Sequence, residues 1–129
     1  MYDASNLVGE VGVACAHPGA TTARTAWVHS DIGAKCFGTA VRTSLVRKYM
    51  RVVGDQVGAP TRAVHLAHAI HLLVERPTLS GCLHFTDAGV ASWYGVACCV
   101  LDTLRQLDRL PPGVDVEPVD SAAFPRPAR

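Results

Sequence analysis

Three histidines at regular spacing are the residues whose type and pattern first suggest chemistry. His65, His68 and His71 recur at every third position of a segment with helical periodicity. At about 100° per residue, His65 and His71 lie about 120° apart on the side opposite the apolar residues. Two imidazoles can bind a metal weakly, but a zinc site needs three or four convergent ligands, and neighbouring positions supply neither a cysteine pair nor a carboxylate. We therefore expect a polar helix surface in preference to a metal site.

The five cysteines show no Cys-x-x-Cys pair. Cys98 and Cys99 are adjacent in an apolar segment, where a mutual disulfide would be strained and cysteine usually packs as a small hydrophobe. An odd number of cysteines favours reduced thiols and a cytoplasmic location. No spacing of Ser, His and Asp indicates a nucleophilic enzyme, and we interpret His84 as structural.

The segment GDQVGAPT, residues 54–61, is the strongest candidate for a ligand-binding loop. It places a carboxylate, an amide and two glycines just before a predicted helix, where exposed backbone amides can receive an anionic or hydroxyl-rich ligand. The alternative is a tight connection between a strand and a helix that needs glycine for steric reasons. The residues alone favour neither.

Composition limits the classes of function. A chain of 129 residues fits one domain, and 12 basic against 11 acidic residues leave a net charge of only +1. With 6% aromatic residues, the chain has neither the charge nor the stacking surface that favours nucleic acid. The longest uncharged apolar stretch, 88–101, is shorter than the roughly 20 residues of a membrane span, so no membrane contact is expected. The first residues show no signal-peptide pattern.

Hydrophobic periodicity predicts helices alternating with short strands, which is typical of the α/β class. The expected helices are 4–16, 37–50, about 61–75 with Thr61 as N-cap, and one after the N-cap Ser92 with Trp93, Ala97, Val100, Leu104 and Leu107 facing inward. The expected strands are 21–29, 51–53, 82–86 and 114–117, with a turn at 31–33 and an extended tail at 124–127. No predicted strand is followed by Gly-x-Gly-x-x-Gly, because Gly9 and Gly12 fall inside a helical pattern.

Taken in order, several short segments resemble the C-terminal half of dTDP-4-dehydrorhamnose reductases, which are extended short-chain dehydrogenases. The Asp-Gln-x-Gly-x-Pro-Thr loop and the Arg-Thr-x-Trp-Val strand are the most specific parts. The resemblance implies that 1–129 is the substrate-binding portion of a Rossmann-type enzyme, that 1–19 is a remnant of the Tyr-x-x-x-Lys helix, and that the N-terminal nucleotide-binding half is not in this chain. The segments that carry it are 2–10, 24–29, 35–37, 52–61, 92–94 and 124–127.

The family reduces the 4-keto group of dTDP-4-dehydro-L-rhamnose with NADPH in dTDP-rhamnose biosynthesis. By resemblance Tyr2 occupies the position of the catalytic tyrosine, whereas Asn6 stands where the family has its lysine. A tyrosine with a pKa near 10 exchanges protons poorly at neutral pH, and the lysine charge favours the phenolate. Because asparagine carries no charge, we expect the catalytic function of Tyr2 to be impaired. NADPH is the cofactor by resemblance, and we expect none to bind this chain alone.

The resemblance also assigns a substrate site. Two positions depart from the family pattern: Cys36 replaces an asparagine, and His29 replaces a tyrosine but can still donate a hydrogen bond. Trp27 lines the sugar site by resemblance, and its alternative is an ordinary buried aromatic residue. The implied substrate-binding residues are Trp27, His29, Phe37, Asp55, Gln56 and Gly58.

These residues predict weak binding of a dTDP-sugar and no reduction by the isolated chain. In the parent fold the strand near 23–29 lies in a parallel sheet made mostly of strands from the other half, so we expect poor autonomous stability and either a partner chain or self-association. The rival interpretation is a non-catalytic sugar-nucleotide-binding or regulatory subunit, related to the regulatory subunit of methionine adenosyltransferase. A pseudogene product without function is a third.

Overall fold

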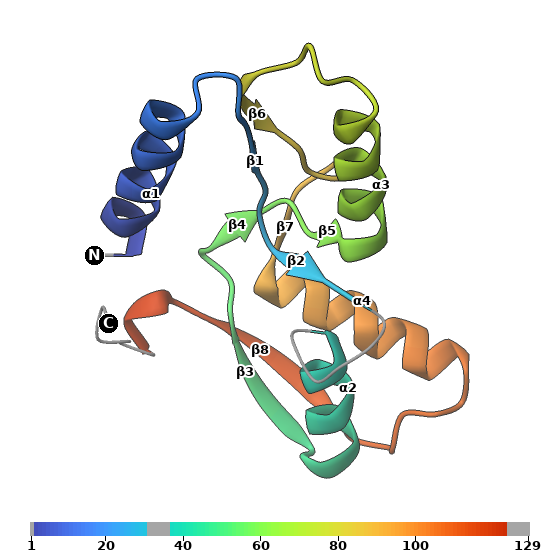
Figure 1. Ribbon diagram of the computed structural model, residues 1–129. Helices are drawn as coiled ribbons and strands as arrows, with labels where there is room; N and C mark the ends of the chain where they lie inside the picture. The colour runs from blue at the N-terminus through green and yellow to red at the C-terminus, as the bar shows by residue number, and fades with distance from the viewer. Residues whose placement is uncertain (1, 31–36, 124–129) are drawn as a thin grey trace.

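The computed structural model describes residues 2–30 and 37–123, and helices alternate with short strands along them (Figure 1). The predicted α/β class is confirmed. The predicted turn at 31–33 and tail at 124–127 lie outside the described residues. In chain order the elements are α1 (Tyr2–Ala16), β1 (Thr21–Arg24), β2 (Val28–His29), α2 (Phe37–Val46), β3 (Tyr49–Val53), β4 (Val57–Gly58), β5 (Thr61–Arg62), α3 (Ala63–Val74), β6 (Gly81–His84), β7 (Ala91–Ser92), α4 (Trp93–Gln106), β8 (Asp115–Val119) and the 3₁₀ helix η1 (Ser121–Ala123).

The core lies where α2 and α4 pack against the parallel pair of β3 and β8. The register of this pair runs from Tyr49 opposite Asp115 to Val53 opposite Val119. Alternate side chains of a strand point to opposite faces, so β3 directs Met50 toward α4. The buried centre consists of Met50, Leu101 and Val114, with Val52, Leu110 and Val116 packed around it.

Helix α4 begins at the predicted N-cap. The Ser92 hydroxyl accepts a hydrogen bond from the Gly95 amide at 3.0 Å, which satisfies one of the amides that a helix start leaves without a partner. The inward face differs from the prediction, because the structure buries Val96, Ala97 and Leu101 and leaves Leu107 60% exposed. Helix α4 contacts both α2 and the β3–β8 pair, so its buried stripe is rotated from the one that periodicity suggested.

A second parallel pair, β1 and β6, lies at the other end of the molecule (Figure 1). Its register runs from Thr21 opposite Gly81 to Arg24 opposite His84. The predicted strand 21–29 is wrong in its continuity: β2 leaves this sheet and pairs in parallel with β5. Trp27 causes the break, because its φ of 46° is a left-handed conformation that no strand residue adopts. Within the described part of the chain, β1 pairs with β6 only.

Three other expected boundaries also differ. The helix predicted over 37–50 ends at Val46, and β3 begins at Tyr49 because burial of Met50 in the core outweighs local helix propensity. Thr61 is not an N-cap: it is fully buried in β5, and α3 starts after Arg62 without a side-chain cap. The loop 54–61 contains β4, which pairs antiparallel with β7.

In the ranges 2–30 and 37–123, no helix has both the length and the apolar composition of a membrane span.

Candidate functional site

Two of the predicted site residues, Trp27 and Gly58, are in direct contact. A Cβ placed on Gly58 would lie 2.4 Å from Cε2 and 2.7 Å from Nε1 of the Trp27 indole, so only glycine fits there. The indole also stacks on Trp93, the first residue of α4, with ring centroids 3.8 Å apart and an interplanar angle of 11°. The loop after β3, the segment between β1 and β2 and the start of α4 therefore meet at one half-buried aromatic pair.

Trp27 reaches this position at a conformational cost. A left-handed backbone in a non-glycine residue costs roughly 1–3 kcal/mol. The Trp27 carbonyl accepts a hydrogen bond from the Thr61 amide at 3.2 Å, and stacking on Trp93 contributes further, since aromatic pairs stabilise by about 0.5–1.5 kcal/mol beyond area burial. Trp93 was missed as a site residue and predicted only as part of a buried helix face. Its place in the Ser-Trp-Tyr segment of the resemblance was the signal that could have found it.

Asp55 and Gln56 are engaged with the segment after β8. Both carboxylate oxygens of Asp55 lie 3.0 Å from the Ser121 amide, and Oδ1 accepts from the Ser121 hydroxyl at 2.7 Å. Gln56 Nε2 donates to the same hydroxyl at 3.0 Å. The backbone bond from Ser121, followed by its side-chain bond, lowers the pKa of Asp55. Ser121 was missed, because it lies 66 positions from Asp55 and no local pattern links the two.

An open depression of about 850 Å³ adjoins this contact. Its charged lining consists of one guanidinium, from Arg51, and two carboxylates, from Asp55 and Asp120. A hydrogen bond with Cys98 raises the pKa of Tyr94 above its ordinary value, so the phenol is protonated at neutral pH. The described residues that line the depression are Arg51, Gly54, Asp55, Tyr94, Pro118, Val119, Asp120, Ala122 and Ala123.

A second carboxylate, Asp87, contacts Arg62 and His65 and is close enough to His29 to interact electrostatically with it. Asp87 accepts a hydrogen bond from the Arg62 amide at 3.0 Å and lies 2.9 Å from His65 Nδ1. These contacts lower the pKa of Asp87, the Arg62 amide most, then His65, with a smaller electrostatic contribution from His29. The sequence did not indicate a carboxylate partner for His65.

The histidine row on α3 is exposed at His65, His68 and His71, as predicted. His71 Nε2 lies 3.4 Å from Glu75 one turn later on the same helix, so the prediction that neighbouring positions supply no carboxylate was wrong. Among the residues that the structure describes, no three His, Cys, Asp or Glu side chains converge on a possible metal position.

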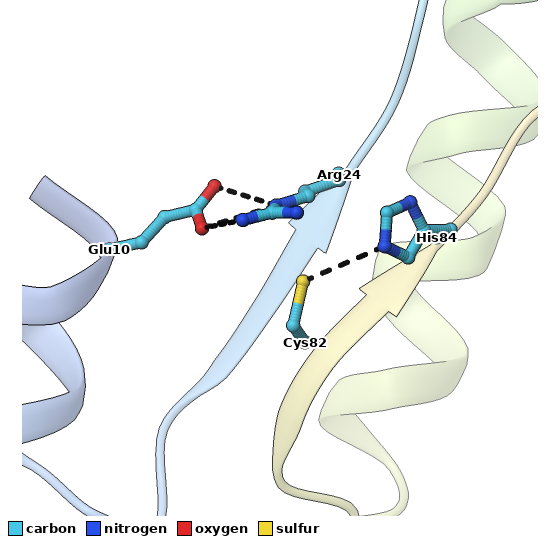
Figure 2. Close-up of polar contacts among 4 residues, drawn as sticks. All are labelled: Glu10, Arg24, Cys82 and His84. Carbon is cyan, nitrogen blue, oxygen red and sulfur yellow. Dashed lines mark hydrogen bonds and ion pairs between the residues drawn. The ribbon is translucent and has the colours of Figure 1, made fainter. Parts of the chain in front are cut away.

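Helix α1 carries Tyr2 and Asn6, the two residues that the resemblance assigned to the positions of the catalytic tyrosine and lysine. Asn6 is exposed on α1 one turn after Tyr2, whose side chain is outside the described set. Figure 2 shows how α1 is fastened to β1: Arg24 Nε and Nη2 lie 2.9 Å and 2.5 Å from the two Glu10 carboxylate oxygens. His84, predicted to be structural, lies on β6 beside this pair, with Nε2 4.0 Å from Cys82 Sγ. The site near Tyr2 thus retains a helix that is held in place, with a neutral amide at the lysine position.

Two further predicted residues receive little description. Phe37 begins α2, but its side chain lies outside the described set, and so does the whole of Cys36. Substrate contact by Phe37, and the loss of a polar contact where Cys36 replaces an asparagine, stay predictions.

The described residues do not fit a dinucleotide phosphate. A phosphate cradle needs a glycine-rich turn between a strand and a helix, with backbone amides pointing at the ligand. Gly9 and Gly12 both lie within α1, where the helix uses its own backbone amides. Gly9 and Gly12 therefore do not form a phosphate-binding turn of this kind.

The comparisons with known proteins identify the family. The sequence profile described as the RmlD substrate binding domain matches residues 1–129. The chain belongs to this family. The contact of Trp27 with Gly58 joins the two motifs that carried the resemblance to the reductases, and the identification with their substrate-binding portion is confirmed.

Curated relatives of this RmlD-type domain are longer proteins. It is 34% identical over 138 residues to the dTDP-4-dehydrorhamnose reductase of Burkholderia thailandensis, covering 99% of this chain and 46% of that protein. The corresponding reductase of Mycobacterium tuberculosis is 38% identical over 133 residues, with 99% of this chain and 41% of that protein covered. The chain therefore spans less than half the length of these relatives.

Solved structures of similar proteins also contain chains more than twice as long as this one. The dTDP-4-dehydrorhamnose reductase of Bacillus anthracis, in complex with NADP, superposes with a TM-score of 0.84 at 30% identity, over 98% of this chain and 43% of that chain. The reductase ortholog of Clostridium acetobutylicum gives a TM-score of 0.85 at 32% identity, over 99% and 43%. These values show that the family fold is retained over the whole described domain.

Proposed function

We propose that this chain forms the sugar-nucleotide side of a dTDP-4-dehydrorhamnose reductase and that it does not reduce substrate alone. The observation that carries the proposal is the contact of Trp27 with Gly58, because it unites the two most specific family motifs in one place. A half-buried pair of indole rings suits a nucleotide sugar, which combines flat apolar surfaces with many hydrogen-bonding groups. Family membership and reductase relatives support the same substrate class.

The chemistry explains why the isolated chain should be inactive. Reduction of the 4-keto group adds a hydride to the carbonyl carbon, and the resulting alkoxide must receive a proton. Tyr2 is the residue aligned for that proton transfer, but Asn6 supplies no positive charge to favour its exchange at neutral pH. The hydride donor, NADPH, has no cradle in the described residues. In the part of the chain that the structure describes, we therefore expect two requirements of the reaction to be unmet.

A cofactor-binding portion is the partner that the exposed surface suits. Helix α1 displays Leu7, Val8, Val11 and Val13 to solvent, with Val8 72% exposed. Strand β1 has β6 as its only partner among the described residues, so its other edge can accept a further parallel strand. We propose that such a portion covers this face, in the cytoplasm. The described cysteines Cys15, Cys82, Cys98 and Cys99 are all free thiols, which supports a reducing compartment.

Oxidation of NADPH in the presence of dTDP-4-dehydro-L-rhamnose tests the catalytic part. The chain alone, and its Asn6→Lys variant alone, should show no turnover. Adding the unmatched portion of the Burkholderia thailandensis reductase as a separate polypeptide should give turnover with Asn6→Lys and much less with Asn6. Turnover by the isolated wild-type chain that disappears in Tyr2→Phe would contradict the proposal.

Ligand-observed NMR with dTDP tests the binding part. Pockets usually enclose most of a ligand, and the open site here should bind weakly, on the order of millimolar or about 4 kcal/mol. ADP is the matched control, because it has the same diphosphate and a different base. Equal signals from ADP and dTDP would mean that the domain does not recognise the deoxythymidine nucleotide.

Asn6 also favours a second function, a non-catalytic sugar-nucleotide-binding or regulatory subunit. A neutral amide at the lysine position removes catalysis without affecting the Trp27 and Gly58 contact. This alternative predicts dTDP binding that persists while the added cofactor-binding portion restores no turnover even in Asn6→Lys.

A further inference from the structure

Asp55 and Gln56 both form hydrogen bonds with one residue, Ser121. The Asp55 carboxylate accepts from the Ser121 amide and hydroxyl, and the Gln56 amide donates to that hydroxyl. The hydroxyl therefore acts as donor and acceptor at once, between two side chains that are neighbours in sequence. We call this arrangement of Asp55, Gln56 and Ser121 the clasp.

The clasp continues the pairing of β3 with β8. The last paired residues are Val53 and Val119, and the Gly54 amide then donates to the Val119 carbonyl at 2.9 Å. The backbones approach closely at this point, because a Cβ on Gly54 would lie 3.3 Å from Cβ of Pro118. After the hydrogen bond of Gly54 with Val119, the side chains of Asp55 and Gln56 bind Ser121 at the start of η1.

The clasp also sets one wall of the open depression. Gly54 and Asp55 line it from the β3 side, and Val119, Asp120, Ala122 and Ala123 line it from the β8 side. Ser121 lies in the middle of that second group and is the residue that the loop holds. Losing the clasp would release the wall while leaving the core around Leu101 intact.

Charge argues against a direct role of Asp55 toward a nucleoside diphosphate. A carboxylate cannot donate to a phosphate oxygen and repels it, and its lowered pKa keeps Asp55 ionised at neutral pH. Among the described residues, the lining carries one positively charged side chain, Arg51, against the carboxylates of Asp55 and Asp120. The position of Asp55 in this loop is therefore better explained by its hydrogen bonds to Ser121 than by contact with an anionic ligand.

We infer that Asp55 and Gln56 are positioning residues that hold Ser121 and thereby set one wall of the open depression, and that neither binds the ligand itself. We assign this depression, whose lining includes neither Trp27 nor Gly58, to the nucleotide sugar as a further part of its site. The inference rests on the proposed function for the identity of the ligand, dTDP-sugar. The sequence resemblance implied that Asp55 and Gln56 contact the ligand directly. The inference assigns them an indirect role instead, through the segment after β8.

A double-mutant cycle with dTDP as the probe distinguishes direct ligand contact by Gln56 from indirect action through Ser121. Gln56→Ala and Ser121→Ala should each raise the dissociation constant by about fivefold, as expected for one net hydrogen bond. The double variant should bind no more weakly than either single variant, because both act through the same contact. Ser121→Thr should rescue binding, since it keeps the hydroxyl, and Gln106→Ala on α4 is the control. Losses that add in the double variant would overturn the inference.

Hydrogen exchange tests the clasp without ligand. In Asp55→Ala the amides of 119–123 should exchange at least about tenfold faster, because the protecting acceptor is lost, while the amides of α3 stay unchanged. Unchanged exchange at Ser121 would overturn the inference. If the wild-type chain binds no dTDP, the proposed function fails, and the exchange measurement still decides whether Asp55 holds this segment.

Discussion

The absence of a side chain at Gly58 leaves room for the Trp27 indole to stack on Trp93. In Gly58→Ala the new Cβ would have to displace the Trp27 indole, which is also held by Trp93. We expect a loss of about 1–3 kcal/mol in the free energy of unfolding, which is typical of overpacking. Urea unfolding measures this loss, and the near-ultraviolet circular dichroism of the stacked tryptophans should weaken in parallel.

A matched control lies in α1. A Cβ on Gly12 would meet no atom within 4 Å, so Gly12→Ala should stabilise the helix by about 0.5–1 kcal/mol. Equal stabilities of the two variants would show that the contact of Gly58 with Trp27 does not constrain the folded chain.

Asp87 should make stability depend on pH in the acid range. Its pKa is lowered in the folded state, first by the Arg62 amide and then by His65. The unfolded chain therefore binds more protons than the folded one as the pH approaches about 4, so the stabilisation is present above that pH and is lost as pH falls through the folded pKa. Urea unfolding between pH 5 and pH 2 should show a shallower decline in Asp87→Asn. His65→Gln should remove a smaller part, and an unchanged slope in Asp87→Asn would refute the assignment.

At the scale of elements, the N-cap residue Ser92 fixes the start of α4, and α4 in turn supplies Leu101 to the core. Ser92→Ala removes the acceptor for the Gly95 amide at the start of the helix that supplies Leu101 to the core. We expect a loss of about 0.5–2 kcal/mol in thermal or urea unfolding. Ser92→Asp keeps an acceptor and should retain most of the stability. Equal losses in both variants would mean that the cap contributes little.

Helix α1 is linked to β1 by a charged contact, whereas α4 supplies Leu101 to the buried core. The described polar link between α1 and β1 is the pair of Glu10 with Arg24, and several of the helix's large apolar residues are exposed (Figure 2). Glu10→Gln should therefore increase amide exchange in α1 while α4 amides remain protected. Unchanged exchange in α1 would show that other contacts hold the helix.

For the whole molecule, the exposed apolar face predicts self-association. Leu7 and Val11 are 55% and 54% exposed and lie one turn apart on α1. Sedimentation velocity should show dimers or larger species for the wild type and a shift toward monomer for the double variant Leu7→Glu with Val11→Glu. Val46→Glu is the control, because Val46 is exposed on α2, away from this face. A monodisperse wild-type monomer with a sharp melting transition would contradict the prediction.

The sequence by itself determined the α/β class, the family, the start of α4 at Ser92 and the exposure of the histidine row. Each of these depends on local signals: a hydrophobic period, a capping hydroxyl beside its own helix, or motifs of fewer than ten residues. Such signals are readable because the interacting groups are close together in the chain.

Only the tertiary structure decided how the site is assembled. Trp27 divides an expected single strand into β1 and β2 because its indole packs against Gly58 and Trp93, and Asp55 faces Ser121 across 66 positions. The residue types allowed several partners for each of these groups. The choice was made by the register of β3 against β8 and by the burial of Met50 and Leu101, which are non-local contacts that no short window of sequence contains.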